Sequence, residues 1–416
     1  MTALHLLLSI VAGLLVQLCL FASFAFFRAN RSAVQLSSPT APIEPAVSSA
    51  HWSGLRAFRV ARRVMEDSAQ AQCSFYLEPV DGQALSPYKA GQFLTFSLTL
   101  GGQSGVALDE LTRCYSLSEA PHPDHYRVTI KRAEPPASQP NVPAGRSSSY
   151  FHDRVQVGSL LQVRAPSGRF HLDTDSMVPV VLIGGGIGIT PMMSMLHWCL
   201  DHQPGRIIHL YYGVRNRTEH AFKSVLEQWA ARVPHFHLHV VYSDKALPAP
   251  PGVDYHHAGQ INVELLKQTL PHGQHQFYVC GPTAMMESLV PALAAWGVPL
   301  ADIHFEAFGP ASVLLPSAKS AVVQGVLPGS ASSLEIRLQR SQRSLVWDNR
   351  EPNLLAFFES HGVAVDSGCR SGSCGSCVTP LLDGEVLYEH TPDFELTPGQ
   401  CLLCVGKPAA ALVLGA

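Results

Sequence analysis

The sequence lacks a marked excess of either charge. Its 416 residues include 29 Lys and Arg against 32 Asp and Glu, which gives a formal net charge of −3. Nucleic acid is therefore not expected as a partner, because its recognition depends on a clear excess of positive charge. The sequence also lacks an internal repeat, so a repeat architecture is not expected. A hydrophobic content of 46% supports full-sized cores, and the length suits about two to four domains.

The first five residues, MTALH, lack Lys and Arg, although a long uncharged segment follows them. Leu6 to Phe27 holds 22 residues without a charge, and Arg28 and Arg31 come directly after it. As a helix, this segment would be about 33 Å long, enough to cross a hydrocarbon core of about 30 Å. A cleaved signal peptide has the opposite order, with a basic region first, and a buried core helix is a further alternative. The positive-inside rule predicts a single-pass transmembrane anchor over residues 1–31, in the inner (cytoplasmic) membrane, with the remaining domains in the cytoplasm.

Four of the ten cysteines have a spacing that is typical of one kind of metal centre. Cys369, Cys374 and Cys377 stand in CRSGSCGSC, and Cys404 follows after 26 further residues. The pattern C-x4-C-x2-C…C is the plant-type arrangement for a [2Fe–2S] cluster, whose two irons need four thiolates. A Gly/Ser-rich loop lets the first three sulfurs converge, and its amide groups can donate to the cluster. A zinc site or a disulfide pair is the alternative, but this spacing fits zinc sites poorly.

The other six cysteines are scattered, mostly in apolar runs, which favours a reducing compartment with free thiols. One of them, Cys401, stands three residues before Cys404 and imitates a C-x2-C pair. Because Cys404 precedes the Val-Gly-Lys-Pro tail that suits this type of motif, we expect Cys404 to be the ligand and Cys401 to be a packing residue.

The order of patterns along the chain predicts three domains joined to the anchor by linkers. Residues 32–54 are rich in Ser, Pro and Ala, and residues 312–333 are rich in Ser, Pro, Gly and Ala. Both segments are typical of flexible linkers. Residues 55–175 show short alternating strands, which predict an antiparallel β-barrel. Residues 176–311 alternate strands with helical stretches, which predicts an α/β domain with a parallel sheet. Residues 334–416 form the α+β cluster domain, in which PNLLAFFESHG predicts a helix that begins at Pro352 and ends before Gly362.

Two turns in the α/β region are candidates for binding a dinucleotide. GGGIGITP follows an apolar strand and leads directly into a helix, so its backbone and the helix N-terminus can approach a pyrophosphate. YVCGP ends a second strand, which should reach the same carboxyl edge of the sheet, where open α/β sheets bind ligands. A glycine-rich turn alone is weak evidence, and Cys280 could be an ordinary buried residue. The candidate residues are Gly184, Gly185, Gly186, Gly188, Thr190, Pro191, Cys280, Gly281 and Pro282.

The barrel region carries two further candidate strings. Arg113 and Tyr115 in RCYSLS share one strand face by the period of two, and Ser116 adds a hydroxyl. In GRSSSYFHD, glycine and serines stand at the start of an apparent helix, which suits a phosphate. Each string alone could be an ordinary strand or an ordinary helix cap.

Together these strings carry a family resemblance. RCYSLS, GRSSSYFHD, VRAPSGRF, GGGIGITPMMSML, YVCGP and HFEAFGP, in this order, resemble the ferredoxin–NADP reductase superfamily, especially the reductase halves of flavohemoglobins and of ring-hydroxylating oxygenase reductases. Residues 334–416 resemble plant-type ferredoxins with the β-grasp fold. The resemblance implies a flavoprotein with FAD, NAD(P)H and a [2Fe–2S] cluster.

The resemblance also implies roles for individual residues. Arg113 would bind the FAD phosphate, Phe93 and Tyr115 would pack on the isoalloxazine, and Ser116 would donate near N5. The segment from Gly145 to Ser148, which includes Ser147, would bind the FAD pyrophosphate. Thr190 and Cys280 would flank the nicotinamide, and Glu306 and Phe308 would close the other side of the flavin. Ser116, Cys280, Glu306 and Phe308 are thus the predicted catalytic residues.

The choice of nicotinamide nucleotide is not decided by the sequence. Arg215, Asn216 and Arg217 follow the strand IIHLYYGV, and Glu219 stands two residues after Arg217. NADH-selective members of the superfamily often have an acidic residue in this segment, whereas NADPH-selective members use Ser and Arg. The segment therefore predicts NAD(P)H, with a slight preference for NADH.

These patterns predict a membrane-anchored NAD(P)H oxidoreductase that passes electrons through FAD and [2Fe–2S] to an external redox protein. An oxygenase, hydroxylase or desaturase component is the expected acceptor. The cluster domain has ten acidic and six basic residues, a net charge of −4, which would suit a basic docking surface, although a merely solvated surface explains it equally well. The alternatives are a quinone-linked respiratory reductase subunit, whose known order of domains is reversed, and a non-enzymatic redox sensor.

The segment PHFHLHV raises a last alternative, a metal site. His235, His237 and His239 alternate and would share one strand face, but no carboxylate or cysteine is near them in the sequence. We therefore expect a solvated strand face.

Overall fold

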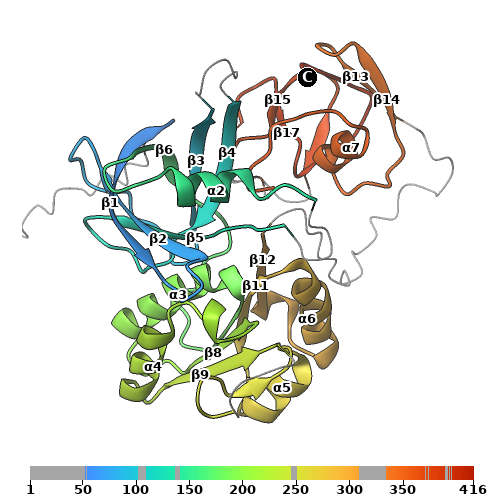
Figure 1. The fold of residues 1–416 in the computed structure, drawn as a ribbon. Helices are drawn as coiled ribbons and strands as arrows, with labels where there is room; N and C mark the ends of the chain where they lie inside the picture. The colour runs from blue at the N-terminus through green and yellow to red at the C-terminus, as the bar shows by residue number, and fades with distance from the viewer. Residues whose placement is uncertain are drawn as a thin grey trace, which may run out of the picture. The chain divides into compact units, whose positions relative to one another are not determined.

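The computed structural model describes residues 52, 54–101, 109–135, 141–244, 251–308, 334–370, 372, 374–388, 392, 394 and 396–416. The predicted anchor and the predicted linker at 312–333 lie outside these residues, as does the linker at 32–54 except for residues 52 and 54. Among the described residues, no helix has both the length and the apolar character needed to cross a bilayer. Residues 51–416 form one unit, in which three sheet regions follow one another along the chain (Figure 1).

The first region is a six-stranded sheet in the order β4-β3-β6-β1-β2-β5, and every neighbouring pair is antiparallel. The edge strands β4 and β5 also meet at one bridge, between Leu117 and Val128. Closure into the predicted barrel stays a prediction. The elements are β1 Arg56–Met65, β2 Gln72–Pro79, β3 Phe93–Leu100, β4 Asp109–Ser116, β5 Tyr126–Lys131, α2 Arg146–Asp153 and β6 Leu160–Ser167.

Aromatic packing fixes helix α2 against this sheet. Phe151 of α2 is fully buried, and its ring lies 5.3 Å from the ring of Phe75 and 5.3 Å from that of Phe96. Tyr115 of β4 packs edge-on against the same Phe151 ring at 5.2 Å. The start of α2 is therefore held beside the end of β4, which brings the strings RCYSLS and GRSSSYFHD together.

The second region is a parallel sheet of six strands in the order β10-β9-β8-β7-β11-β12. Its strands alternate with helices along the chain, which confirms the predicted α/β pattern. The elements are β7 Val180–Gly185, η1 Gly186–Gly188, α3 Ile189–His202, β8 Ile208–Val214, η2 Arg217–Glu219, α4 Lys223–Arg232, β9 Phe236–Tyr242, β10 His257–Ala258, α5 Val263–Thr269, β11 Gln276–Gly281, α6 Thr283–Trp296, η3 Leu300–Asp302 and β12 Ile303–Ala307.

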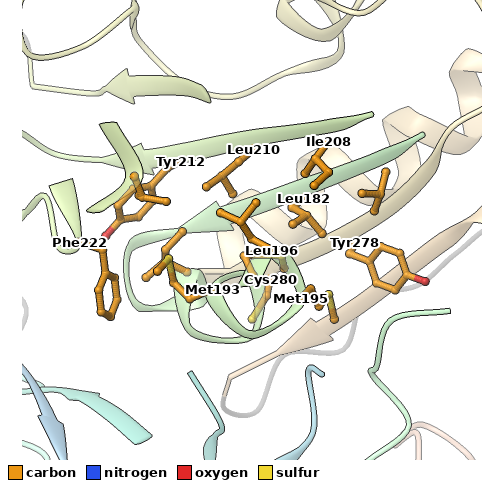
Figure 2. Close-up of a cluster of buried hydrophobic side chains, with 14 of the residues drawn as sticks. Leu182, Met193, Met195, Leu196, Ile208, Leu210, Tyr212, Phe222, Tyr278 and Cys280 are labelled. Carbon is orange, nitrogen blue, oxygen red and sulfur yellow. The ribbon is translucent and has the colours of Figure 1, made fainter. Parts of the chain in front are cut away.

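Helices cover both faces of this sheet, so alternate residues of each strand enter different cores. On one face, Leu182, Ile208 and Leu210 pack against α3 and α4; Figure 2 shows them beside Leu196 of α3. On the other face, Ile183 and Tyr211 pack against α5 and α6, with residues such as Leu266 and Leu289. Because both faces are covered, the central strands are buried along their length, as is usual for parallel sheets.

The histidines of PHFHLHV lie only in part on a solvated face. His237 is exposed, whereas His239 is half-buried and its ring stacks 4.3 Å from the ring of Tyr211. The His239 Nε2 atom also lies 3.5 Å from Nδ1 of His209, on the neighbouring strand β8. Pairing between strands therefore draws His239 into a histidine cluster that the sequence of one strand does not reveal.

The third region carries the four cysteines of the predicted cluster. A five-stranded sheet has the order β14-β13-β19-β15-β17, and β16 pairs with β18. Trp347 and Phe357 pack edge to face at 5.1 Å in its core. The elements are β13 Leu334–Leu338, β14 Arg343–Trp347, α7 Leu354–Ser360, β15 Val378–Asp383, β16 Val386–Tyr388, β17 Gln400–Leu402, β18 Gly406–Pro408 and β19 Leu412–Leu414.

Helix α7 begins later than the sequence pattern predicted. Its N-cap is Asn353, whose side chain accepts a hydrogen bond of 2.9 Å from the backbone of Ala356. Pro352 therefore precedes the cap instead of occupying the first helical position, because an Asn side chain satisfies an open helix amide that proline cannot.

Candidate functional site

The four cysteines of the predicted cluster converge in two pairs. The Cys369 amide donates to Cys374 Sγ at 3.2 Å, and the Cys374 amide donates to Cys369 Sγ at 3.3 Å. The Cys404 amide donates to Cys377 Sγ at 3.4 Å, although 27 positions separate them. The Cys404 thiol is also hydrogen bonded to Cys377, which lowers the pKa of Cys377 and raises that of Cys404.

This arrangement fits a two-iron cluster better than the alternatives. Two pairs of thiols, each with backbone amides aimed at sulfur, match two irons with two cysteine ligands each. Within the described residues, no group of three or more His, Cys, Asp or Glu side chains is placed to hold a single metal ion. The nine cysteines in this part of the chain are all free, so a disulfide is not formed.

Cys401, the neighbour of the pair, has a different environment. It is fully buried on β17, within the core of the third region. Burial raises the pKa of its thiol to about 12, so the thiol stays protonated at neutral pH. These features suit the packing residue that the sequence predicts.

A cavity of about 380 Å³ gathers most of the predicted flavin residues. It is bordered by the end of strand β4, the starts of β3 and α3, the end of β12 and Cys369, the first of the four predicted cluster ligands. Its lining includes Phe93, Arg113, Tyr115, Ser116, Thr190, Glu306, Phe308 and Cys369. Residues that lie more than 200 positions apart in the sequence therefore surround one space.

The start of helix α2 offers open backbone amides beside this cavity. Its N-cap, Gly145, makes no side-chain capping bond, so the first helix amides remain available for an anion such as a pyrophosphate. The Tyr115 hydroxyl forms a 2.7 Å hydrogen bond with Ser147 Oγ, which ties β4 to this helix. Burial raises the pKa of Tyr115 to about 12, so its hydroxyl stays protonated.

Ser148 and Arg113 make local contacts that the sequence did not indicate. The Ser148 hydroxyl accepts from the Ala133 amide and donates to the Gly145 carbonyl, both at 3.0 Å. It therefore supports the loop before α2. The exposed Arg113 guanidinium donates to the Thr112 carbonyl at 2.7 Å, at the rim of the cavity.

Two buried polar atoms in the flavin cavity form no hydrogen bond of good geometry among the described residues, although their side chains lie close enough to interact with each other. They are Ser116 Oγ and Glu306 Oε2. Burial raises the pKa of Glu306 to about 8, and the nearby Cys369 adds to this rise. A buried polar atom without a partner is costly, so a group that supplies donors and acceptors, such as the flavin ring edge, fits this position.

The glycine turn after β7 packs directly against the turn after β11. A Cβ atom at Gly188 would lie 2.2 Å from the Cys280 carbonyl oxygen, so only glycine permits this close approach. Gly186 has a φ of +54°, which glycine adopts readily, and open space surrounds it. The turn therefore presents its backbone at the carboxyl edge of the sheet, where a nucleotide phosphate can approach.

Cys280 itself is buried beneath this turn. It has no exposed surface and belongs to the apolar cluster between the sheet and α3 (Figure 2). Burial raises the pKa of its thiol well above the ordinary value. It does not line the flavin cavity, so its role beside a nicotinamide stays a prediction.

A second cavity, of about 330 Å³, extends from the glycine turn across the ends of β8 and β9. Its lining includes Gly213 and Met285 and four residues that stay predicted nucleotide-binding residues, namely Gly185, Gly186, Arg215 and Pro282. Lys131, at the end of β5, lines both this cavity and the flavin cavity.

Lys131 and Glu219 are site residues whose pairing the sequence did not reveal. The Lys131 Nζ atom lies 2.6 Å from Glu219 Oε2, and Arg215 Nη1 lies 3.4 Å from Glu219 Oε1. One carboxylate therefore faces two cations at the nucleotide cavity. In the sequence, Glu219 stands out only as an acidic residue after the strand IIHLYYGV, and no pattern singles out Lys131.

Family models and relatives agree with this geometry. Residues 182–290 match the model of the oxidoreductase NAD-binding domain, and residues 336–409 match that of the 2Fe-2S iron-sulfur cluster binding domain. This chain is an oxidoreductase of the ferredoxin reductase type. The NAD-binding region thus precedes the iron-sulfur domain along the chain, and the expected cofactors FAD, NAD(P)H and [2Fe–2S] are confirmed.

Individual relatives cover different parts of the chain. A flavohemoprotein of Bacillus cereus is 35% identical over 263 residues, which are 63% of this chain and 63% of that protein. The chain therefore spans less than two thirds of this curated relative. The FAD/NAD-binding domain of nitric oxide dioxygenase from Vibrio cholerae is 31% identical, with a TM-score of 0.53. The match covers 62% of this chain and 100% of that domain's chain. Phthalate dioxygenase reductase is 26% identical, with a TM-score of 0.51. The match covers 87% of this chain and 98% of the reductase chain.

Proposed function

We propose that this protein is a membrane-anchored NAD(P)H reductase that passes electrons through FAD and [2Fe–2S] to an external redox protein. The observation that carries the proposal is the lining of the flavin cavity. Thr190, from the nucleotide-binding turn, and Cys369, a predicted cluster ligand, both line it. A flavin accepts a hydride and releases single electrons, which is the conversion that a one-electron cluster requires.

The residues around the cavity have distinct tasks in this proposal. Tyr115 and Phe93 hold the flavin ring, and the open amides of α2 bind the FAD pyrophosphate. Ser116 and Glu306 supply hydrogen-bonding groups at the buried side of the ring. Phe308 is 39% exposed, so it can move aside when a nicotinamide stacks on the flavin.

An oxygenase, hydroxylase or desaturase component is the acceptor that we propose. Phthalate dioxygenase reductase, which is described as transferring electrons from pyridine nucleotides to [2Fe–2S], matches this chain over nearly its whole length. The net charge of −4 on residues 334–416 also suits a basic docking surface.

The anchor, the location and the barrel belong to the same proposal. The uncharged segment Leu6–Phe27, followed by Arg28 and Arg31, supports an inner-membrane protein with cytoplasmic catalytic domains. The bridge between Leu117 and Val128, which joins the edge strands of the first sheet, supports its closure into a barrel.

The test separates the two halves of the electron path. Purified wild-type protein should contain about two irons and one FAD per chain. In Cys374→Ser, the cluster absorbance should disappear while FAD stays bound. Ferricyanide can draw electrons directly from the flavin, so its reduction by NAD(P)H should survive, whereas cytochrome c reduction should fall at least about tenfold.

Cys401→Ala is the matched control, because Cys401 is a neighbouring cysteine outside the two pairs. It should keep the cluster and both activities. Equal loss of ferricyanide and cytochrome c reduction in Cys374→Ser, with FAD still bound, would contradict the proposed order. Reduction of a quinone by wild-type protein without any added redox protein would favour a respiratory role instead.

A further inference from the structure

A third cavity lies at the edge of the parallel sheet opposite to the nucleotide-binding turns. Its volume is about 540 Å³, compared with about 380 and 330 Å³ for the flavin and nucleotide cavities. It is bordered by the end of α5, the loop before β11 and the loop after α6. We call it the amino-edge pocket; its lining residues are Lys267, Leu270, Pro271, His272, Gly273, Gln274, His275, Phe277, Trp296, Gly297, Val298 and Pro299.

The ring of Trp296, which packs on the buried Phe277, gives the amino-edge pocket a wall for a planar apolar group. The rings of Phe277 and Trp296 meet edge to face, with centroids 6.2 Å apart. Trp296 is only half-buried, so part of its surface remains accessible. Such a wall is typical of small-molecule sites, whose volumes are about 300–1,000 Å³.

The charges of the amino-edge pocket favour an anion. Its lining contains one lysine and two histidines but no Asp or Glu. The Lys267 Nζ atom lies 5.7 Å from the centroid of the Trp296 ring. Among the described residues, no carboxylate lies within ion-pair distance of Lys267. An anionic group that reaches this ammonium would therefore sit beside the tryptophan ring.

His275, which belongs to the same lining, holds a buried hydrogen-bond acceptor. It is 6% exposed, and its Nδ1 atom lies 3.1 Å from the Gly273 carbonyl oxygen. A carbonyl oxygen can only accept, so Nδ1 carries the proton and Nε2 carries the lone pair. Nε2 has no partner within the described part of the chain, and burial lowers the pKa of His275, which keeps the ring neutral.

We propose that the amino-edge pocket binds an aromatic carboxylate. Trp296 contacts the ring, with the buried Phe277 behind it, and Lys267 contacts the carboxylate. This site is separate from the nucleotide cavity, with which it shares no lining residue, so the ligand and the nicotinamide nucleotide can be bound together.

The test uses the full-length holoprotein, purified in detergent, and 4-hydroxybenzoate as the probe. Calorimetric titration should show saturable binding of one equivalent, with the same affinity in the presence of saturating NAD⁺. 4-Hydroxybenzamide has the same ring and hydroxyl but no charge, so it should bind about fivefold more weakly, the size expected for one exposed ion pair.

Two variants and one control locate the binding. Lys267→Met, an exposed substitution that keeps the apolar stem, should remove the preference for the acid over the amide. Trp296→Leu should weaken both compounds, and its FAD content and circular dichroism report whether it still folds. Lys89→Met, another exposed lysine but in the first sheet region, should bind like wild type.

Three outcomes with the wild-type protein would overturn the proposal. They are the absence of saturable binding to wild type, equal binding of the acid and the amide, and displacement of the probe by NAD⁺. An unchanged preference in Lys267→Met would overturn it as well, because the carboxylate would then lie elsewhere.

Discussion

Lys131 and Glu219 form a 2.6 Å ion pair that joins two separate sheets. Lys131 ends β5 of the flavin region, and Glu219 lies in the 3₁₀ turn η2 after β8 of the nucleotide region. Glu219 also forms an ion pair with Arg215, and all three side chains line the nucleotide cavity. A single carboxylate therefore offsets two cations at the place where a dinucleotide would bind.

This arrangement predicts that Glu219 disfavours NADPH. The 2′-phosphate of NADPH would have to compete with the carboxylate for Lys131 and Arg215. In Glu219→Gln, both cations become available, so KM for NADPH should fall by about fivefold or more relative to KM for NADH, with kcat nearly unchanged. Steady-state kinetics with both nucleotides measures this ratio.

Glu227→Gln is the matched control for that substitution. Glu227 forms an ion pair with Lys223 on α4 and does not line the nucleotide cavity. Its nucleotide preference should equal that of wild type. If Glu219→Gln and Glu227→Gln give the same ratio of KM values, Glu219 has no part in the selection.

The features that could be predicted correctly from the sequence depend on residues that lie close together along the chain. The spacing from Cys369 to Cys377 suits the ligands of a [2Fe–2S] cluster, and the glycine turn at Gly184 to Gly188 suits close approach of a phosphate to the backbone. The family models match both regions. The alternation of strands and helices likewise predicted the parallel sheet, because both faces of each strand are apolar.

Contacts between distant segments could not be predicted in the same way. Lys131 and Glu219 are 88 positions apart, and their pairing depends on how two sheets meet. The position of His239 beside His209 depends on the register of β8 and β9, which periodicity within one strand does not fix. The predicted start of α7 was wrong by two residues, because proline suits the first helical position but the side chain of Asn353 caps the helix after it.

The hydrogen bond between Tyr115 and Ser147 predicts a graded loss of FAD affinity. Tyr115→Phe keeps the ring but removes the hydroxyl that contacts Ser147 at 2.7 Å. Because a buried neutral hydrogen bond contributes about 1 kcal/mol, FAD should dissociate about fivefold more readily. Tyr115→Leu also removes the ring and should cause a larger loss.

Ser147→Ala completes this comparison. If the two hydroxyls act together, Tyr115→Phe combined with Ser147→Ala should weaken FAD binding little more than either change alone. Fluorescence titration of the apoprotein with FAD measures all four affinities. Full additivity of the two single changes would show that the hydrogen bond makes no contribution to FAD binding.

The proposed anchor predicts that residues 1–31 hold the protein in the membrane. Full-length protein should stay in the membrane fraction after a carbonate wash, because about 22 uncharged residues bury enough apolar surface to resist extraction. Deletion of residues 1–31 should release the protein while NAD(P)H–ferricyanide activity is kept. A mature protein that begins after Phe27 would instead indicate a cleaved signal.

The histidine cluster around His209 predicts that acid destabilises the parallel-sheet region. His209 is 4% exposed, and burial, with a smaller contribution from His237 and His275, lowers its pKa to about 4. In the unfolded chain the pKa of histidine is about 6.5. As the pH falls below about 6.5, the unfolded chain binds the proton first, so the free energy of unfolding decreases until the pH approaches about 4.

His209→Leu should remove this part of the pH dependence, because leucine fits the apolar face under α5 and α6 and does not titrate. Between pH 7 and pH 5, wild type should lose about 2 kcal/mol more of its free energy of unfolding than the variant does. Urea unfolding at the two pH values, followed by tryptophan fluorescence, measures this difference. His237→Gln, at the exposed neighbour of His209 on β9, should keep most of the wild-type pH dependence. An equal loss of stability in wild type and His209→Leu would show that His209 is protonated in the folded protein at pH 5, in contradiction to the low pKa that its burial implies.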